Sequence, residues 1–147
     1  PRTGRSPRRI LFDTNVVSEL MRPRPDPGVL AWMDTQEMSA VWLCSINVLE
    51  IELGIELVET TERRLRLRQL WLQLLEQDFG RRALQFDGTA ATHSACLLAL
   101  KRKQGRTIEL RDAMIAGIAQ QHGCLLATRN VRHFEDCGVA LINPWAL

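Results

Sequence analysis

Short apolar runs alternate with helical patterns along this sequence of 147 residues. The clearest run is Ile10-Leu11-Phe12, which stops abruptly at Asp13 before a helical pattern begins. Comparable runs occupy residues 40–44, 124–127 and 139–142, and a weaker one occupies 82–87. Strands buried on both faces read as continuous apolar runs, and their alternation with helices is typical of parallel sheets. The sequence therefore predicts an α/β fold, with a mainly parallel central sheet of about four to five strands flanked by helices (α/β/α).

Helical patterns fill the segments between these runs. We expect helices that start at Thr14 and Pro27, and others at residues 46–58, 62–77, 89–103 and 111–122. Gly54 lies inside the helix at 46–58, where glycine costs about 1 kcal/mol relative to alanine. We therefore expect another backbone to approach closely at Gly54.

Charge is unevenly distributed along the chain. The formal net charge is +2, from 19 basic and 17 acidic residues. Residues 1–9 hold four arginines and no acid, and removing these four from the 19 leaves 15 basic residues and a net charge of −2. The Arg, Pro, Ser and Gly content of this segment is typical of disorder. We therefore expect a disordered basic tail at residues 1–9 and one folded domain at residues 10–147.

Composition also argues against membrane and secreted proteins. No apolar run approaches the roughly 20 residues that span a bilayer, and the first residues lack the apolar core of a signal peptide. We therefore expect a cytoplasmic protein without membrane contact. The four cysteines lack paired CxxC spacing and three lie in apolar surroundings, which favours small core residues over metal ligands or disulfides.

Polar residues fall at equivalent places around the predicted strands. Asp13 ends the first strand, Glu50 lies in the helix after the second, and Asp112 opens the helix before the fourth. Thr128 and Asn130 follow that fourth strand. Open parallel sheets bind ligands at the carboxyl ends of their strands, so we expect these residues to converge at one edge. For Asp13 considered alone, helix capping and ligand binding are equally good interpretations.

Three clustered carboxylates repel one another, and burying them unpaired is costly. A cation among them removes that cost, and ligand sets made only of oxygen favour Mg²⁺ or Mn²⁺. Such an ion polarises a phosphoryl oxygen, lowers the pKa of bound water and stabilises the leaving oxygen. The acids therefore favour a hydrolase of phosphodiesters that needs no Ser or His nucleophile. Of the three histidines, only His133 follows closely enough on Asn130 to lie near such a site.

Four segments, taken in order, carry a recognisable pattern: LFDTNVVSEL (11–20), SINVLEIELGI (45–55), RDAMIAGIAQQHGCLLATRN (111–130) and INPW (142–145). Together they resemble the PIN-domain ribonucleases, and more closely the VapC-type toxins of bacterial toxin–antitoxin pairs, in the FitB branch. The likeness covers about residues 10–147. It implies a PIN domain that acts as a metal-dependent endoribonuclease toxin, hydrolysing RNA phosphodiester bonds with a metal-activated water and Mg²⁺ or Mn²⁺ as the cofactor.

The resemblance also implies a role for each matching residue. The family's metal-binding acids correspond to Asp13, Glu50 and Asp112, and its fourth catalytic position corresponds to Asn130. Its supporting polar positions correspond to Thr14, Asn15 and Thr128.

Two positions depart from the family pattern. Asn130 stands where relatives often have Asp, and His133 stands where many relatives have an acid before Phe. The site therefore carries three formal negative charges, so we expect weaker binding of a second metal ion and a resting state with one ion. Asn130 still offers a carbonyl oxygen, which is compatible with activity.

Partners follow from the same resemblance. It implies a homodimer that acts on RNA and forms a heterotetramer or larger complex with a small antitoxin. The antitoxin's N-terminal part would bind operator DNA, so that DNA contact is indirect, and its C-terminal segment would cover apolar helices and block the acidic site. Our candidate groove for that segment is lined by Val17, Leu20, Met21, Leu53, Leu57 and Trp71.

Two other interpretations compete with this one. The chain could be a weakly active PIN-like module that acts mainly as an antitoxin-binding co-regulator at operator DNA, which the departures at Asn130 and His133 favour. It could also be a phosphatase or receiver-like protein with Asp13 as phospho-acceptor. That chemistry usually requires a second acid two residues on, where this chain has Asn15, and it leaves Glu50 and Asp112 unexplained.

Overall fold

The computed structural model describes residues 8–147, and its strands form one parallel sheet. The strands are β1 (Ile10–Phe12), β2 (Val41–Cys44), β3 (Ala83–Leu84), β4 (Leu125–Ala127) and β5 (Ala140–Ile142), in the order β3-β2-β1-β4-β5. Each neighbouring pair runs parallel, which confirms the predicted sheet. The strand predicted at 82–87 shortens to two residues because the chain turns after it, where the N–H of Asp87 donates to the carbonyl of Gln85 at 3.1 Å.

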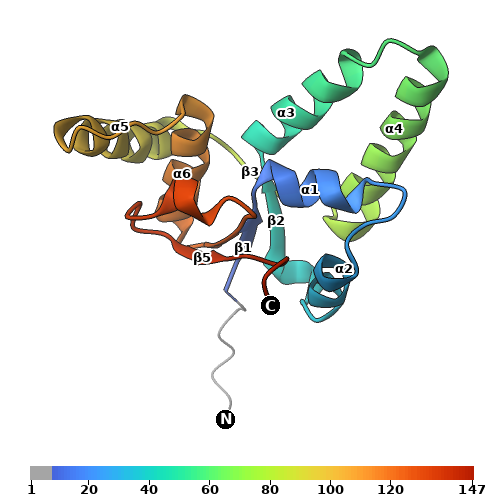
Figure 1. Cartoon of the computed structure of the whole chain (residues 1–147), viewed down its shortest axis with the longest axis horizontal. Helices are drawn as coiled ribbons and strands as arrows, with labels where there is room; N and C mark the ends of the chain where they lie inside the picture. The colour runs from blue at the N-terminus through green and yellow to red at the C-terminus, as the bar shows by residue number, and fades with distance from the viewer. Residues whose placement is uncertain (1–7) are drawn as a thin grey trace.

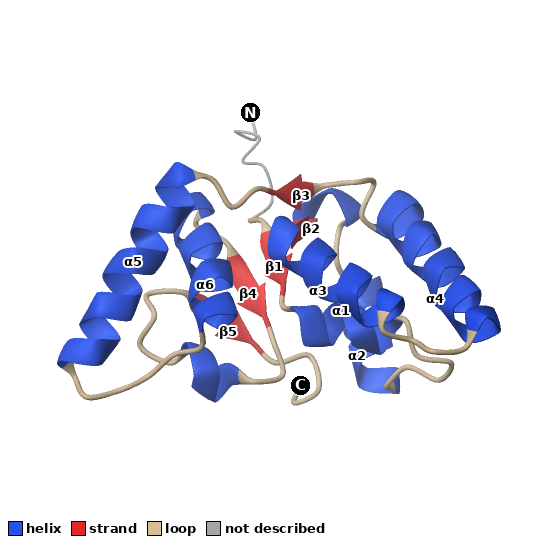
Figure 2. Ribbon diagram, turned by 90° about the horizontal axis from the view of Figure 1, so that it is seen from above, coloured by secondary structure: helices blue, strands red, loops and turns tan. Residues whose placement is uncertain are grey.

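Helices cover both faces of this sheet (Figures 1 and 2). They are α1 (Thr14–Leu20), α2 (Pro27–Asp34), α3 (Ser45–Glu56), α4 (Thr61–Gln73), α5 (Gly88–Lys103) and α6 (Leu110–His122). Three short helical segments complete the fold: η1 (Met38–Ala40), η2 (Leu74–Asp78) and η3 (Val131–Phe134). Helices α5 and α6 lie on one side, and α1 to α4 lie on the other (Figure 2). Within residues 8–147, no helix is long and apolar enough to cross a membrane.

The alternation of side chains along β1 divides the core into two clusters. Leu11 faces the α6 side, where it packs with Ile115 and Leu126, whereas Phe12 faces the α1 side. Successive side chains of a strand point to opposite faces, so a three-residue strand supplies both clusters. On the α1 side, the ring of Phe12 meets that of Phe79 edge-on at 5.2 Å between centroids.

The order of the strands reverses beside β1. The chain runs from β1 outward to β2 and β3, and then returns to place β4 on the other side of β1. Because the helices leaving β1 and approaching β4 cover opposite faces, a crevice opens at the carboxyl ends of these two strands. Phe12 pairs with Ala127 in register, so Asp13 and Thr128 emerge side by side at that edge.

Helices α5 and α6 pack very closely, and the reason is a glycine that the sequence did not single out. A Cβ atom built on Gly117 would lie 2.6 Å from the backbone oxygen of Ala90 and 2.1 Å from the hydroxyl oxygen of Ser94. Ser94 donates in turn to the carbonyl of Ala113 at 2.8 Å. The close approach expected at Gly54 was wrong, because nothing lies within 4 Å of a Cβ built there.

Two further expectations for the α3–α4 side need correction. Trp71 and Val17 are both fully buried, so neither can line a docking groove as we expected. Trp71 lies in the core because the carboxylate of Glu52 accepts its indole N–H at 2.8 Å, which satisfies the only polar group of the ring. The helix predicted at 62–77 also changes at Gln73, where the last turns widen into the π-helical segment η2.

Residues 1–7 of the predicted tail lie outside the described residues, so its disorder stays a prediction. The remaining two tail residues contact the folded part. The carbonyl of Arg9 accepts the N–H of Leu125 at 2.9 Å, and its guanidinium lies 4.8 Å from the ring centroid of Trp42. Among the cysteines, Cys44, Cys124 and Cys137 are buried and all four are free, which confirms the interpretation of three as core residues.

Candidate active site

Asp13 follows β1 and holds the centre of the site. One carboxylate oxygen accepts the N–H of Thr14 at 2.8 Å, so Asp13 caps α1. The other oxygen accepts the hydroxyl of Thr128 at 2.8 Å and the side-chain amide of Asn15 at 3.1 Å. Burial nevertheless raises the pKa of Asp13, and these hydrogen bonds only oppose that effect. The capping interpretation is therefore confirmed, and the carboxylate is also held at the sheet edge at a cost in free energy.

Glu50 reaches the same edge through Thr14. The hydroxyl of Thr14 donates to Glu50 at 2.9 Å and accepts the side-chain amide of Asn47 at 2.9 Å. Asn47 is fully buried, and its own carbonyl oxygen accepts the N–H of Cys44 at 2.8 Å. This chain of hydrogen bonds fixes the start of α3 against the start of α1, and thereby orients Glu50. Sequence reasoning missed Asn47, although an Asn in the first turn after a buried strand is a capping signal.

Asp112 approaches from the first turn of α6, on the opposite side of the crevice. One of its oxygens lies 3.2 Å from Nδ1 of His133, which follows β4 in η3. Burial and the neighbouring charge of Asp13 together raise the pKa of Asp112 to about 6. The charge of Asp13 acts on Asp112 in the direction expected for neighbouring carboxylates, because a like charge disfavours ionisation. His133 does lie near the site, as its position in the sequence indicated.

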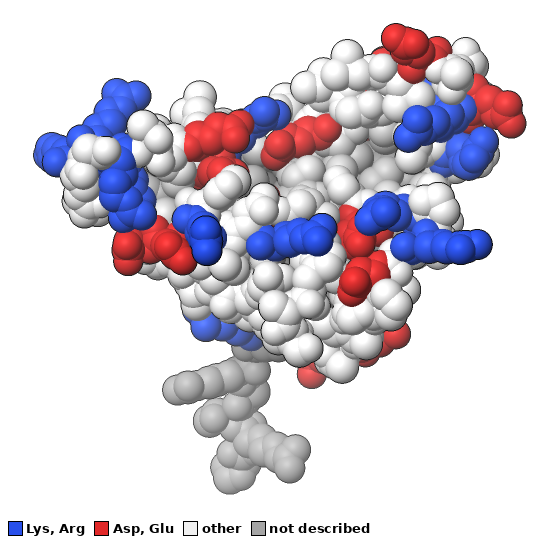
Figure 3. Space-filling model, viewed as in Figure 1, with Lys and Arg blue, Asp and Glu red and all other residues white. Residues whose placement is uncertain are grey.

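Arg111 links the two sides of the crevice. Its guanidinium lies 3.4 Å from the carboxylate of Glu50 and 3.3 Å from that of Glu109. Figure 3 shows acidic side chains gathered at the upper edge of the molecule, between the α5–α6 side and the α3–α4 side, with basic side chains to either side of them. Arg111 thus supplies a positive charge between carboxylates that otherwise repel.

Asn130 is held at the site by its backbone. Its N–H donates to the hydroxyl of Thr128 at 3.0 Å, and its carbonyl accepts the N–H of His133 at 3.0 Å. Its side chain is exposed and makes no hydrogen bond within the described part of the chain. Asn15 is better fixed, because its carbonyl oxygen accepts the N–H of Arg129 at 3.3 Å. All seven residues that the sequence selected therefore lie at one edge of the sheet.

The donor set fits a divalent cation in its chemistry. Burial raises the pKa values of both Asp13 and Asp112, and a nearby cation would favour their ionised forms. Within residues 8–147, however, no three acidic, His or Cys side chains are grouped closely enough to hold a metal ion. The reason is that Glu50 is turned toward Thr14 and Arg111, while Asp112 is turned toward His133.

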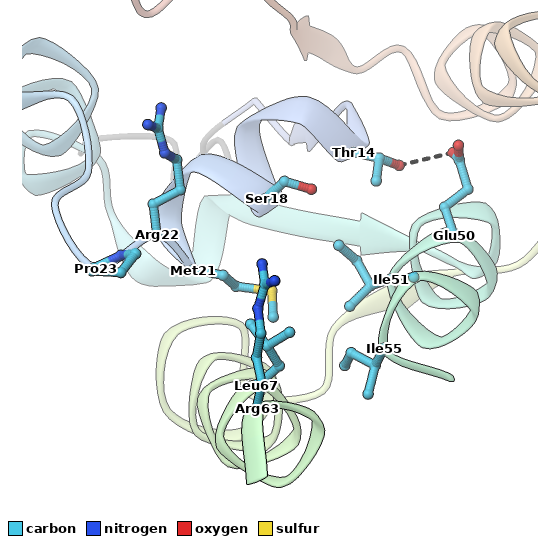
Figure 4. A pocket seen from close by; sticks show the side chains of 11 residues that line it. Thr14, Ser18, Met21, Arg22, Pro23, Glu50, Ile51, Ile55, Arg63 and Leu67 are labelled. Carbon is cyan, nitrogen blue, oxygen red and sulfur yellow. Dashed lines mark hydrogen bonds between the residues drawn. The ribbon is translucent and has the colours of Figure 1, made fainter. Parts of the chain in front are cut away.

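A pocket of about 270 Å³ continues from Glu50 along the α3–α4 side. Figure 4 shows Met21, Ile51, Ile55 and Leu67 around it, with Glu50 at one end and Arg63 across it. Beside the pocket, Leu53 and Leu57 are 48% and 71% exposed. The predicted groove therefore keeps Met21, Leu53 and Leu57 as accessible or lining residues, but it loses Val17 and Trp71.

The family model of the PIN domain matches residues 10–138. The chain belongs to the PIN-domain family. Asp13 therefore lies at the sheet edge of a PIN domain, and Glu50 and Asp112 approach it from helices on opposite sides.

Curated PIN-domain relatives match almost the whole of the domain. The plasmid stability protein StbB of Pseudomonas syringae pv. tomato is 41% identical, over 92% of this chain and 98% of its own length. A VapC ribonuclease of Sinorhizobium fredii is 36% identical, over 92% of this chain and 97% of its own. Toxin FitB of Neisseria gonorrhoeae is also 36% identical, over 92% and 98% respectively.

Solved structures give the same PIN-domain fold. The FitAcB structure from Neisseria gonorrhoeae superposes with a TM-score of 0.82 at 35% identity, and covers 94% of this chain and 99% of that one. The structure of DNA-bound VapBC from Salmonella typhimurium superposes with a TM-score of 0.76 at 25% identity, over 92% and 98%. These matches confirm the sequence-based assignment to PIN domains of the VapC and FitB type.

Proposed function

We propose that this chain is the endoribonuclease toxin of a VapBC-type toxin–antitoxin module, and that it hydrolyses RNA phosphodiester bonds. The observation that carries the proposal is that three separate chain segments bring Asp13, Glu50 and Asp112 to one edge of the sheet. Full-length similarity to proteins named as VapC ribonucleases supports this assignment of the chemistry. The name of one such relative specifies tRNA(fMet). That target belongs to the relative, and we do not assign it to this chain.

The proposed cofactor is Mg²⁺ or Mn²⁺, held by Asp13, Glu50 and Asp112. These three residues offer only oxygen donors, and oxygen-only donor sets favour a hard cation. When bound, the ion would polarise the phosphoryl oxygen and lower the pKa of a water molecule. Glu50 and Asp112 each have a partner in this structure, and release from Arg111 and His133 would free their oxygens for the ion.

The surrounding residues have positioning roles in this proposal. Thr128 and the N–H of Thr14 hold the two oxygens of Asp13, so its carboxylate plane is fixed before any substrate arrives. Asn47 holds Thr14, which holds Glu50. Holding Asp13 and Thr14 in place before the substrate arrives lowers the cost of assembling the site during the reaction. Arg111, once released from Glu50, would carry a positive charge toward the phosphate.

An antitoxin is the proposed regulator. Relatives of this chain occur in structures described as FitAB bound to DNA and VapBC bound to DNA, which supports an antitoxin partner and indirect contact with operator DNA. We propose that the antitoxin's C-terminal segment covers Leu53, Leu57 and the pocket beside Glu50. A homodimer of this chain, within a heterotetramer or larger complex, stays part of the same proposal.

The direct test compares Asp13→Asn with Asp87→Asn in an RNA cleavage assay. Both aspartates cap helices, since Asp13 accepts the N–H of Thr14 and Asp87 accepts that of Ala90. Only Asp13 lies at the proposed site. We expect Asp13→Asn, or EDTA, to lower cleavage by at least about 10²-fold, as loss of a group that acts on developing charge does, while Asp87→Asn keeps activity. Equal cleavage by the two variants, or cleavage that resists EDTA, would contradict the proposal.

A further inference from the structure

A second pocket lies on the α6 side of the site, away from the pocket beside Glu50. Its volume is about 250 Å³, and it is formed by the end of α5, the segment leading into α6, the first turn of α6 and η3. Asp112 and His133 line it, so it opens directly beside the proposed catalytic carboxylates. The other charged side chains that line the pocket belong to Lys101, Arg106, Glu109 and Arg132.

Lys101 is the unusual member of this pocket. The residue is only 3% exposed, and its ammonium group donates to the backbone carbonyl of Glu135 at 2.8 Å. Within residues 8–147 it forms no ion pair with a carboxylate, and that carbonyl is its only hydrogen-bond partner. An ammonium group has three donors, and burying a charge without an opposite charge is costly. Lys101 therefore retains donors and a positive charge that an anion in the pocket would satisfy.

The rest of the pocket is also suited to an anion. Arg132 is exposed and forms no ion pair or side-chain hydrogen bond within residues 8–147, and Arg106 is paired only at the rim, with Asp136 at 3.2 Å. The two lining carboxylates already have partners, because Glu109 lies 3.3 Å from the guanidinium of Arg111 and Asp112 lies 3.2 Å from Nδ1 of His133. Three basic side chains thus line the pocket together with two carboxylates that are engaged elsewhere.

The backbone adds to this electrostatic bias. Helix α6 begins at the pocket, and its N-cap residue, Glu109, provides no side-chain hydrogen bond to the free N–H groups of the first turn. Helix N-termini carry a partial positive charge and attract phosphate groups. The buried ammonium of Lys101 and the uncapped end of α6 therefore point to the same kind of ligand. Figure 3 shows basic side chains gathered at the outer end of α5.

We propose that this Lys101 pocket binds a phosphate group of the RNA strand, next to the phosphate that is cleaved. The inference rests on the proposed ribonuclease function, because it assigns the pocket to the same substrate. The position beside Asp112 explains why one strand would meet both places: a strand whose scissile phosphate lies at the acids continues past His133 into the pocket. Lys101, Arg106 and Arg132 would then determine where along the strand the cut is made.

The test measures binding without cleavage. Fluorescence anisotropy of a labelled single-stranded RNA, in EDTA and over a range of salt concentrations, would compare Arg132→Gln and Lys101→Met with the control Lys103→Gln. Lys103 is exposed in the last turn of α5, carries the same charge, and does not line the pocket. Arg132→Gln keeps the test valid if Lys101→Met fails to fold, because Arg132 lies on the surface.

We expect Arg132→Gln and Lys101→Met to weaken RNA binding on the order of tenfold, and to reduce the salt slope of log affinity by about 1, as loss of one phosphate contact does. Lys103→Gln should change affinity by less than about twofold. A 5′-phosphorylated oligonucleotide and its 5′-hydroxyl form would identify the source. Tighter binding of the first indicates a terminal phosphate, equal binding indicates an internal diester, and both support the pocket.

The proposal would be overturned if Arg132→Gln bound RNA as well as the parent protein, or if Lys103→Gln weakened binding to the same extent. These outcomes are separable from failure of the ribonuclease function. A protein that binds RNA through Arg132 but never cleaves it with Mg²⁺ or Mn²⁺ would refute the proposed function and retain the pocket. A protein that cleaves RNA with unchanged KM in Arg132→Gln would refute the pocket and retain the function.

Discussion

The helices on the two sides of the sheet pack in different ways. On one side, α5 and α6 are in such close contact at Gly117 that the hydroxyl of Ser94 and the carbonyl of Ala90 occupy the space of a side chain. On the other side, α3 and α4 diverge from the sheet as a projecting pair (Figure 1) and leave leucines exposed at Leu53, Leu57 and Leu65. The α5–α6 side also exposes Leu100 and Leu110, but the exposed leucines of α3 and α4 are more numerous and form an apolar surface that a partner could cover.

The difference reflects how each pair is held together. Backbone contact joins α5 to α6, so small residues are required there. Ion pairs at the surface join α4 to α3, because Arg68 lies 3.0 Å from Glu52 and 2.5 Å from Glu56. Such partly exposed pairs contribute little to stability. Most of the cohesion of α3 and α4 therefore comes from buried residues such as Trp71, and little of it comes from their outer faces.

The largest expected effect is on Gly117→Ala. The added Cβ would meet backbone at 2.6 Å, and backbone cannot rotate away as a side chain can. We expect the free energy of unfolding to fall by about 3 kcal/mol, the upper range for overpacking a core. Urea denaturation would measure it. A loss below about 0.5 kcal/mol would show that the α5–α6 contact is adaptable, and would remove the contrast drawn between the two sides.

The next largest effect is expected on antitoxin binding, at the exposed leucines Leu53 and Leu57. Leu53→Glu combined with Leu57→Glu should leave the free energy of unfolding within about 0.5 kcal/mol, because both side chains are largely exposed. The same change should weaken antitoxin binding at least about tenfold if this face is the docking surface. Isothermal titration with the purified antitoxin would measure it, and Leu100→Glu, an exposed leucine on α5, is the matched control.

Gly54→Ala should change the free energy of unfolding in the opposite direction to Gly117→Ala. Since nothing lies within 4 Å of the added methyl group, the variant should gain helix propensity without a clash. We expect the free energy of unfolding to rise by about 0.5–1 kcal/mol, the difference between alanine and glycine inside a helix. The same urea titration would detect it. A loss of stability would mean that α3 requires the freedom of glycine at this position.

The last expected effect depends on pH and lies between the two sides, at Asp112. Its pKa is raised to about 6 by burial and by Asp13, so in the absence of metal its ionisation opposes folding. The native protein should therefore lose stability as pH rises from about 4 through 6, and Asp112→Asn should lose less. Thermal melts in EDTA at pH 4 and pH 7.5 would show the variant gaining relative to the parent only at the higher pH. A gain that is equal at both values would exclude the carboxylate charge as the cause.

Some features of the site and the packing could be predicted from the sequence, and others could not. Asp13 was recognised because an acid that ends an apolar run is a local signal, and both its capping role and its place at the sheet edge follow from the parallel strand before it. No local signal in the sequence distinguishes Gly54 from Gly117. Both are helical glycines, and only the path of a second helix decides which one has a neighbour within a bond length or two.

The sequence by itself determined the parallel α/β architecture, the buried cysteines and the set of polar residues at one edge, because hydrophobic periodicity and strand ends are local properties. Only the tertiary structure decided that Trp71 is in the core, that Asn47 and Thr14 orient Glu50, and that Lys101 is buried in the same pocket as Asp112 with no acidic partner among the described residues. These facts depend on which segments meet across the reversal of strand order at β1. Contacts between distant segments are set by packing of the whole chain, and no short stretch of sequence encodes them.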